Sequence, residues 1–274
     1  MRHALPRRPL LLAALAMPAI GRAQGIEPAD TPRRAARWRE LKQAIFGDRP
    51  TEPAGAALDL DVPGRALDAA LVPVGLALSA EVAPGIVAIH LVIDENPLPL
   101  AAVFRAGQPG ALRALTTRVR VDAYTNLHAV AETADGRLLE TARFIKAAGG
   151  CSAPMGGDLE SARQRMGRMR LTLPEGPPGP GRVVPVQVAV SHPNTSGLQM
   201  DQLTRLSIPA EYVRRLTVGY AGTAVLTVES DISIAENPTF GFTLAGHPGG
   251  ELHVEAEDNR SRRFAAHWTL DAGG

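Results

Sequence analysis

Several residue types and patterns are scarce in this chain of 274 residues, and each scarcity excludes a class of protein. Aromatic residues make up only 4%, which argues against a large stacking platform for ligand rings. The 29 basic and 28 acidic residues alternate without a sustained basic run, so no nucleic-acid role is expected. Beyond the N-terminal region no apolar run is long enough to span a bilayer. The single cysteine, Cys151, excludes a disulfide within the chain.

The first residues have the pattern of an export signal. Basic residues at positions 2–8 precede an apolar stretch at 10–20, and Gly21 and Ala23 place small residues before a cleavage point. We therefore expect a signal peptide over 1–23. Arg7 and Arg8, followed by Pro-Leu-Leu, also resemble a twin-arginine motif, so export by either the Sec or the twin-arginine route is compatible. The expected location is the periplasm, without membrane insertion.

The region after the signal predicts a short helix. Residues 24–36 are polar and punctuated by proline, which indicates a loose segment. From Trp38 to Phe46 the apolar residues fall on one helical face, and Gly47 with Pro50 then provides a stop. We expect a helix that docks on the following domain.

From residue 58 the apolar period changes to two, which is typical of strands. Seven short segments with turn chemistry between them predict a β-sandwich of immunoglobulin type over 37–151. These segments are residues 58–62, 71–78, 86–93, 98–104, 115–121, 127–132 and 139–145.

A second set of strands follows a connector over 152–182, which has helical composition at 158–168 and a Pro/Gly-rich stretch at 174–181. The second sandwich is expected over 183–274. Its predicted strands are residues 183–191, 203–208, 213–220, 223–228, 239–244, 251–256 and 263–270. The predicted fold is therefore all-β: two immunoglobulin-like β-sandwich domains in tandem, with a short N-terminal helix and a partly helical connector.

The cysteine lies between these two domains, in a segment of small residues. Glycines precede Cys151, and Ser-Ala-Pro follows it; these neighbours are Gly149, Gly150, Ser152, Ala153 and Pro154. The composition indicates an exposed thiol on a flexible arm, restrained because both ends are anchored. Lys146 is the only basic residue close in sequence that would lower the thiol pKa. Two other interpretations remain: a small buried side chain, or a disulfide between two chains.

The sequence contains no recognisable catalytic or metal-binding pattern. The seven histidines are scattered, and none pairs with another at metal-ligand spacing, so no metal or cofactor is expected. His192 precedes a proline in a loop and could approach the neighbouring domain, although a structural role is favoured. No nucleophile elbow or cysteine-protease signature surrounds Cys151, so no enzymatic activity is expected.

The two halves resemble a known pair of subunits, SoxY and SoxZ of the sulfur-oxidation carrier. The SoxY-like motifs are AIFGDR at 44–49, ALVPV at 70–74, IDENP at 93–97, TRVRV at 117–121, VAETADG at 130–136 and the closing GGC at 149–151. The SoxZ-like motifs are HPNTSGL at 192–198, IPA at 208–210, ENP at 236–238 and DN at 258–259. The order of the motifs resembles fused SoxYZ-like proteins associated with quinoprotein (PQQ) dehydrogenases.

The resemblance implies a periplasmic covalent carrier that holds a sulfur-containing intermediate on Cys151 and presents it to partner enzymes. Its partners would be sulfur-oxidation enzymes, or a quinoprotein dehydrogenase or cytochrome. The SoxZ-like half would be a non-catalytic scaffold. The alternative is a non-covalent docking module for a quinoprotein dehydrogenase or cytochrome, with Cys151 incidental. In this chain Ser152-Ala153-Pro154 replaces the second glycine pair of the SoxY arm, and the chain continues.

Overall fold

The computed structural model describes residues 31–202, 204–247 and 250–270. It contains two α-helices, α1 (Pro32–Phe46) before the first strand and α2 (Leu159–Gln164) between the two halves, and two short 3₁₀ turns. The strands of the first half are β1 (Thr51–Pro53), β2 (Leu58–Asp61), β3 (Val72–Leu78), β4 (Ile86–Ile93), β5 (Leu100–Ala106), β6 (Ala114–Val119), β7 (Thr125–Thr133) and β8 (Leu138–Ile145). Those of the second half are β9 (Met169–Thr172), β10 (Val183–Val190), β11 (Val213–Tyr220), β12 (Thr223–Ser230), β13 (Thr239–Ala245), β14 (Gly250–Asp258) and β15 (Arg263–Leu270).

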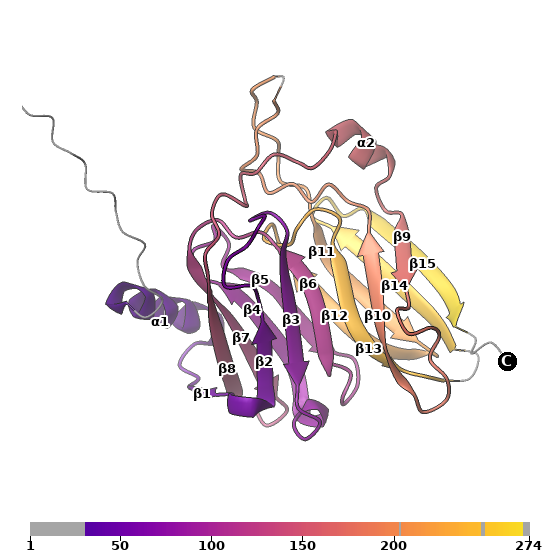
Figure 1. Cartoon of the computed structure of the whole chain (residues 1–274). Coiled ribbons are helices and arrows are strands. Elements are labelled where there is room, and N and C mark those ends of the chain that lie inside the picture. The colour runs from indigo at the N-terminus through magenta and orange to yellow at the C-terminus, as the bar shows by residue number, and fades with distance from the viewer. Residues whose placement is uncertain (1–30, 203, 248–249, 271–274) are drawn as a thin grey trace, which may run out of the picture.

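Two immunoglobulin-like β-sandwiches lie side by side, as the sequence predicts, and their sheets are continuous (Figure 1). One layer is a nine-stranded sheet with the order β1-β8-β7-β4-β5-β12-β11-β14-β15. The other is a six-stranded sheet with the order β2-β3-β6-β13-β10-β9. The first half therefore joins the second through β5 against β12 in one layer and β6 against β13 in the other. Backbone pairing, as well as side-chain packing, fixes the two halves relative to each other.

The alternating apolar pattern forms one core that runs through both halves. In β2 the leucines are buried and the aspartates exposed, and β14 shows the same alternation. Phe104 on β5 and Phe240 on β13 meet edge to face across the junction, with ring centroids 6.5 Å apart. Aromatic pairs at this separation add to the stabilisation from burial.

Helix α1 covers the outer face of the nine-stranded sheet. Trp38 stacks on His128 of β7 at 3.7 Å between ring centroids and donates a hydrogen bond to Glu140 of β8. Leu41 and Phe46 are also buried. This confirms the docking helix predicted from residue 38 onward.

The helix begins earlier than predicted, because Thr31 caps it and Pro32 occupies its first turn. Residues 32–36, which were predicted to be loose, are therefore helical. The expected signal peptide at 1–23 and the start of the loose segment lie outside the described residues. Within the described residues no helix is long and apolar enough to cross a membrane.

One predicted strand of the second half is absent, and one strand was not predicted. Residues 204–208 form a turn closed by an isolated bridge between Met200 and Ser207, because Arg205 takes a left-handed backbone conformation that ends extended pairing. Conversely, β9 lies in the segment interpreted as connector, where it pairs with β10 at the edge of the six-stranded sheet. Helix α2 is also shorter than predicted, since Gly167 has a positive φ of 82°.

Candidate functional site around Cys151

The segment that carries Cys151 leaves the end of β8 and lies along the chain that follows β6. Lys146 still pairs with residues 64–66 through its backbone. The N–H of Gly149 then donates to the carbonyl of Asp122 at 2.8 Å, and the N–H of Gly150 donates to the carbonyl of Val121 at 3.0 Å. The glycines before the cysteine are therefore held by backbone hydrogen bonds.

Gly150 is required here for close packing. A Cβ atom at Gly150 would lie 2.0 Å from the carbonyl oxygen of Ala69 and 2.7 Å from that of Val121. Backbone atoms cannot give way at such distances, so no residue with a side chain fits this conformation. Gly149, by contrast, has open space around it. Glycine is favoured there because the backbone has a positive φ of 78°. The glycine pair thus seats the arm against the protein.

The second sandwich covers the arm from the other side. The hydroxyl of Ser196 donates to the carbonyl of Cys151, and the side-chain amide of Gln199 donates to the carbonyl of Ala153 at 2.9 Å. Ser196 and Gln199 are also bonded to each other, from the N–H of Ser196 to the amide oxygen of Gln199 at 3.1 Å. The loop that follows β10 therefore closes over the cysteine.

Cys151 is completely buried, and its thiol is free. The expectation of an exposed thiol on a flexible arm is wrong for this conformation, because the local sequence does not reveal the loop from the second domain that covers it. The expected restraint is present and is stronger than predicted. A disulfide to another chain cannot form at a buried thiol without movement of the arm.

The surroundings of Cys151 suppress its reactivity. Burial, reinforced by the charges of Asp122 and Asp231, raises the pKa of the thiol to about 12, while Arg120 opposes the shift. The nucleophilic thiolate is therefore scarce at neutral pH. Asp231 shares the polar region at the junction, and its own burial raises the pKa of its carboxyl to about 7.

A buried polar network supports this junction. The Nη1 atom of Arg120 donates to the carbonyls of Ile232 at 3.3 Å and Ile234 at 2.5 Å. The side-chain amide of Asn96 donates to the carbonyl of Arg120 and to the hydroxyl of Ser233. These contacts join the two halves directly beside the arm.

Two of the residues singled out from the sequence are not brought to the thiol. Lys146 is half-buried just after β8. The charged residues that shift the pKa of the thiol are Asp122, Arg120 and Asp231, and Lys146 is not among them. His192 is buried, with Nε2 3.6 Å from Asp258 and Nδ1 accepting the N–H of Asn194. The favoured structural role of His192 fits this position, since it anchors the base of the covering loop.

Sequence reasoning missed the residues that surround the arm: Asn96, Arg120, Ser196, Gln199 and Asp231. Asn96 lay within the IDENP motif without an assigned role, although it is buried and its side chain bonds to two segments, 120–122 and the one that holds Ser233. The TRVRV motif already contained Arg120, and HPNTSGL contained Ser196. No spacing rule in the sequence would connect these motifs with the cysteine.

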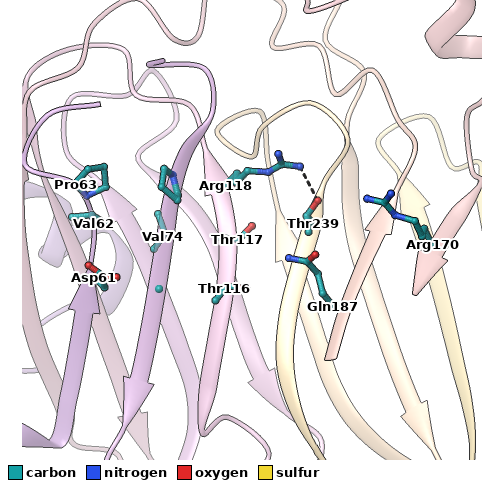
Figure 2. A pocket seen from close by; sticks show the side chains of 12 residues that line it. Asp61, Val62, Pro63, Val74, Thr116, Thr117, Arg118, Arg170, Gln187 and Thr239 are labelled. Atoms are coloured by element: carbon teal, nitrogen blue, oxygen red, sulfur yellow. Dashed lines mark hydrogen bonds between the residues drawn. The ribbon is translucent and has the colours of Figure 1, made fainter. Parts of the chain in front are cut away.

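A separate hollow lies on the outer face of the six-stranded sheet. It has a volume of about 520 Å³ and crosses the junction between β6 and β13. In Figure 2 the guanidinium groups of Arg118 and Arg170 point toward each other, and Arg118 donates to the hydroxyl of Thr239 at 3.0 Å. Cys151 does not line this hollow. Among the described residues no group of three potential ligands could hold a metal ion.

Comparisons with known proteins identify two successive families. Residues 42–151 match the family of sulfur oxidation protein SoxY, and residues 175–269 match the family of sulphur oxidation protein SoxZ. No curated protein matches the chain.

Two solved structures give weaker similarities. The sulfur carrier protein SoxY from Chlorobium limicola f thiosulfatophilum is 28% identical, over 41% of this chain and 96% of its own, with a TM-score of 0.35. A beta-glycosidase from Bacteroides vulgatus is 10% identical, over 84% of this chain and 26% of its own, with a TM-score of 0.24.

Proposed function

This chain is a fusion of a SoxY-family domain and a SoxZ-family domain, and we propose that it is a sulfur carrier whose cargo is bound covalently to Cys151. The observation that carries the proposal is the position of the thiol. The single cysteine of the chain is the last residue of the SoxY match, and the SoxZ half closes over it. The chain is proposed to hold a sulfur-containing intermediate and to present it to enzymes, without catalysis of its own.

Carriage requires the arm to leave its seat. A thiol that is buried and has a pKa of about 12 is protected from adventitious reaction, but it is equally closed to a partner enzyme. Four hydrogen bonds hold the segment: those of Gly149, Gly150, Ser196 and Gln199. Since each net hydrogen bond contributes only about 1 kcal/mol, a docking partner has enough binding energy to release the arm.

An apolar rim around the covered cysteine supports partner docking there. Several large apolar side chains are exposed on the two loops that contact the arm: Leu67, Leu71, Leu198, Met200 and Leu206. Ala69, between Leu67 and Leu71, packs on Gly150, and Ser196 and Gln199 lie beside Leu198 and Met200 in the chain. Exposed apolar groups clustered at one end of a protein are typical of interaction surfaces. Sulfur-oxidation enzymes are the expected partners of SoxY and SoxZ domains.

The finer details of this proposal come from the resemblance. We place the protein in the periplasm, and the cargo would be a persulfide or thiosulfonate. The order of the fused domains resembles carriers that accompany quinoprotein dehydrogenases, so a PQQ dehydrogenase or a cytochrome is the candidate partner besides sulfur-oxidation enzymes.

A second candidate function is a non-covalent docking module for the same partners. The burial of Cys151 and its raised pKa favour this alternative, because an incidental cysteine would also be buried and unreactive. The two candidates differ in whether the sulfur atom of Cys151 ever carries a group.

Intact mass of the native protein, isolated without reductant, separates the two candidates. A carrier shows an adduct that maps to Cys151 and disappears on reduction, and Cys151→Ser abolishes its physiological activity. Ser152→Ala is the matched control, since Ser152 is exposed and adjacent. An unmodified thiol together with full activity of Cys151→Ser would overturn the carrier proposal and leave the docking module.

A further inference from the structure

We propose that Arg120 is an anion subsite of the carrier arm, which holds the negatively charged end of a sulfur group attached to Cys151. The ligand class is a monoanionic sulfur species, such as a persulfide or an S-sulfonate. The inference rests on the proposed function, because it assigns a second residue to the same site.

Arg120 is a buried cation without an anionic partner among the residues that the structure describes. Its side chain is 2% exposed, and its two acceptors are the backbone carbonyls of Ile232 and Ile234, both bonded through Nη1. The Nε atom is buried and has no hydrogen-bond partner among the described residues. No described carboxylate forms an ion pair with it; Glu236 acts on it only at longer range and instead accepts the N–H of Gly156.

Such an arrangement is unfavourable in a protein that has no anion to bind. Burying a charge is unfavourable unless it is paired, and Arg carries five N–H donors that need acceptors. Burial lowers the pKa of Arg120, which reflects the same cost. A guanidinium kept charged and incompletely bonded inside a protein is therefore prepared for an anionic ligand.

The carrier thiol is the group placed to supply that anion. Val121, the residue after Arg120, accepts the hydrogen bond of Gly150, the residue before Cys151. The two side chains also interact electrostatically. In the unloaded protein the thiol is neutral, so Arg120 has no counter-charge at this position; a negatively charged sulfur group provides one.

Two carboxyl groups oppose a negative charge on Cys151. The negative charges of Asp122 and Asp231 both raise the pKa of its thiol. Asp231 has a pKa raised to about 7 by burial, so near neutral pH much of it is protonated and repels an anion less than a full carboxylate would. Asp122 is only half-buried, where solvent screens its charge.

Arg118, near the end of β6, provides a matched control. It lies two residues before Arg120, on the outer face of β6, where it donates to Thr239 and lines the hollow of Figure 2. Replacing Arg118 removes the same charge at a small separation along the chain, but on the outer face of the sheet and not in the buried network beside the arm.

The test compares adducts of opposite charge on Cys151. In mild urea the thiol reacts with methanethiosulfonates, forming a Cys–S–S–R disulfide and releasing methanesulfinate; R is 2-sulfonatoethyl (anionic) or 2-trimethylammonioethyl (cationic). After refolding, dithiothreitol cleaves the disulfide by exchange, and intact mass gives the rate. The same rates in full urea correct for intrinsic reactivity.

The expected result is that folding slows reduction of the anionic adduct at least about tenfold more than that of the cationic adduct, as for a charged hydrogen bond. Arg120→Gln removes this preference, Arg120→Lys keeps part of it, and Arg118→Gln keeps all of it. Equal protection of both adducts in the wild-type protein, or an unchanged preference in Arg120→Gln, would overturn the subsite.

If Arg120→Gln fails to fold, the test still decides, because the two adducts of the wild-type protein can be compared with each other. Failure of the subsite can be told apart from failure of the carrier proposal. A native adduct on Cys151 with no charge preference refutes the subsite alone, whereas an unmodified native thiol together with full activity of Cys151→Ser refutes the carrier.

Discussion

The hydroxyl of Ser196 donates a hydrogen bond to the carbonyl of Cys151, across 45 residues of chain and between the two sandwiches. The contact joins the residue that ends the SoxY match to a loop in the SoxZ match. It gives the SoxZ half a defined role as the cover of the arm. In a fused chain this cover is always present at the same effective concentration, so it does not depend on subunit association.

Removal of this cover should expose the thiol. We expect the double variant Ser196→Ala, Gln199→Ala to react with iodoacetamide about tenfold faster than the wild-type protein, because two hydrogen bonds to the arm are lost. Intact mass against time gives the rate. Gln202→Ala is the control, since the side-chain amide of Gln202 donates to the carbonyl of Met200 on the same loop and, among the described residues, does not bond to the arm. Equal rates in all three proteins would show that these bonds do not hold the arm.

A side chain at Gly150 should displace the arm from its seat. Gly150→Ala places a Cβ atom against the carbonyls of Ala69 and Val121, so the segment must move by more than side-chain adjustment allows. We expect the thiol to titrate near its ordinary pKa and to react at least about tenfold faster, since burial is lost. Gly157→Ala in the following segment meets open space and should leave the reactivity unchanged. A slow thiol in Gly150→Ala contradicts the tight seat.

Asp231 should make the folded protein less stable as the pH rises. Burial raises its pKa from 3.8 to about 7, so folding favours the protonated carboxyl. The contribution of Asp231 to the free energy of unfolding is therefore lost as the pH rises from about 4 to 7, and it does not change further above pH 7. We expect Asp231→Asn to stabilise the protein at pH 8 by on the order of 2 kcal/mol, and by much less at pH 4.5.

Urea unfolding at the two pH values measures this effect. Asp59→Asn is the control, because Asp59 is exposed on β2. The same change in stability at both pH values would mean that Asp231 is not held in a desolvated site.

The continuous sheets should make the two halves unfold together. Each half contains one tryptophan, Trp38 on α1 and Trp268 on β15, so the fluorescence of Trp268→Phe reports the first half and that of Trp38→Phe the second. Within each variant, fluorescence and far-ultraviolet circular dichroism should give the same midpoint in urea. Non-coincident transitions in either variant would indicate that the β5–β12 and β6–β13 pairings do not couple the halves.

Much of the fold follows from local patterns in the sequence. The alternation of Leu58, Leu60 and their aspartate neighbours, and similar patterns elsewhere, predicted most strands because one face of each must be buried. The helical face of Trp38 and Leu41 was equally visible. The missed β9 is a short edge strand, where pairing depends on neighbours more than on residue type. The strand predicted at 203–208 failed for another reason, since residues 204–208 form a turn around the left-handed Arg205.

The sequence by itself determined that one thiol stands at the junction of two similar domains, because composition, period and position are all local properties of the chain. Only the tertiary structure decided whether that thiol is exposed. Its burial depends on Ser196 and Gln199, and its charge environment on Arg120 and Asp231. These residues are far apart in sequence and come together because the strands of the two halves pair. The burial of Cys151 and the raised pKa of its thiol result from that arrangement.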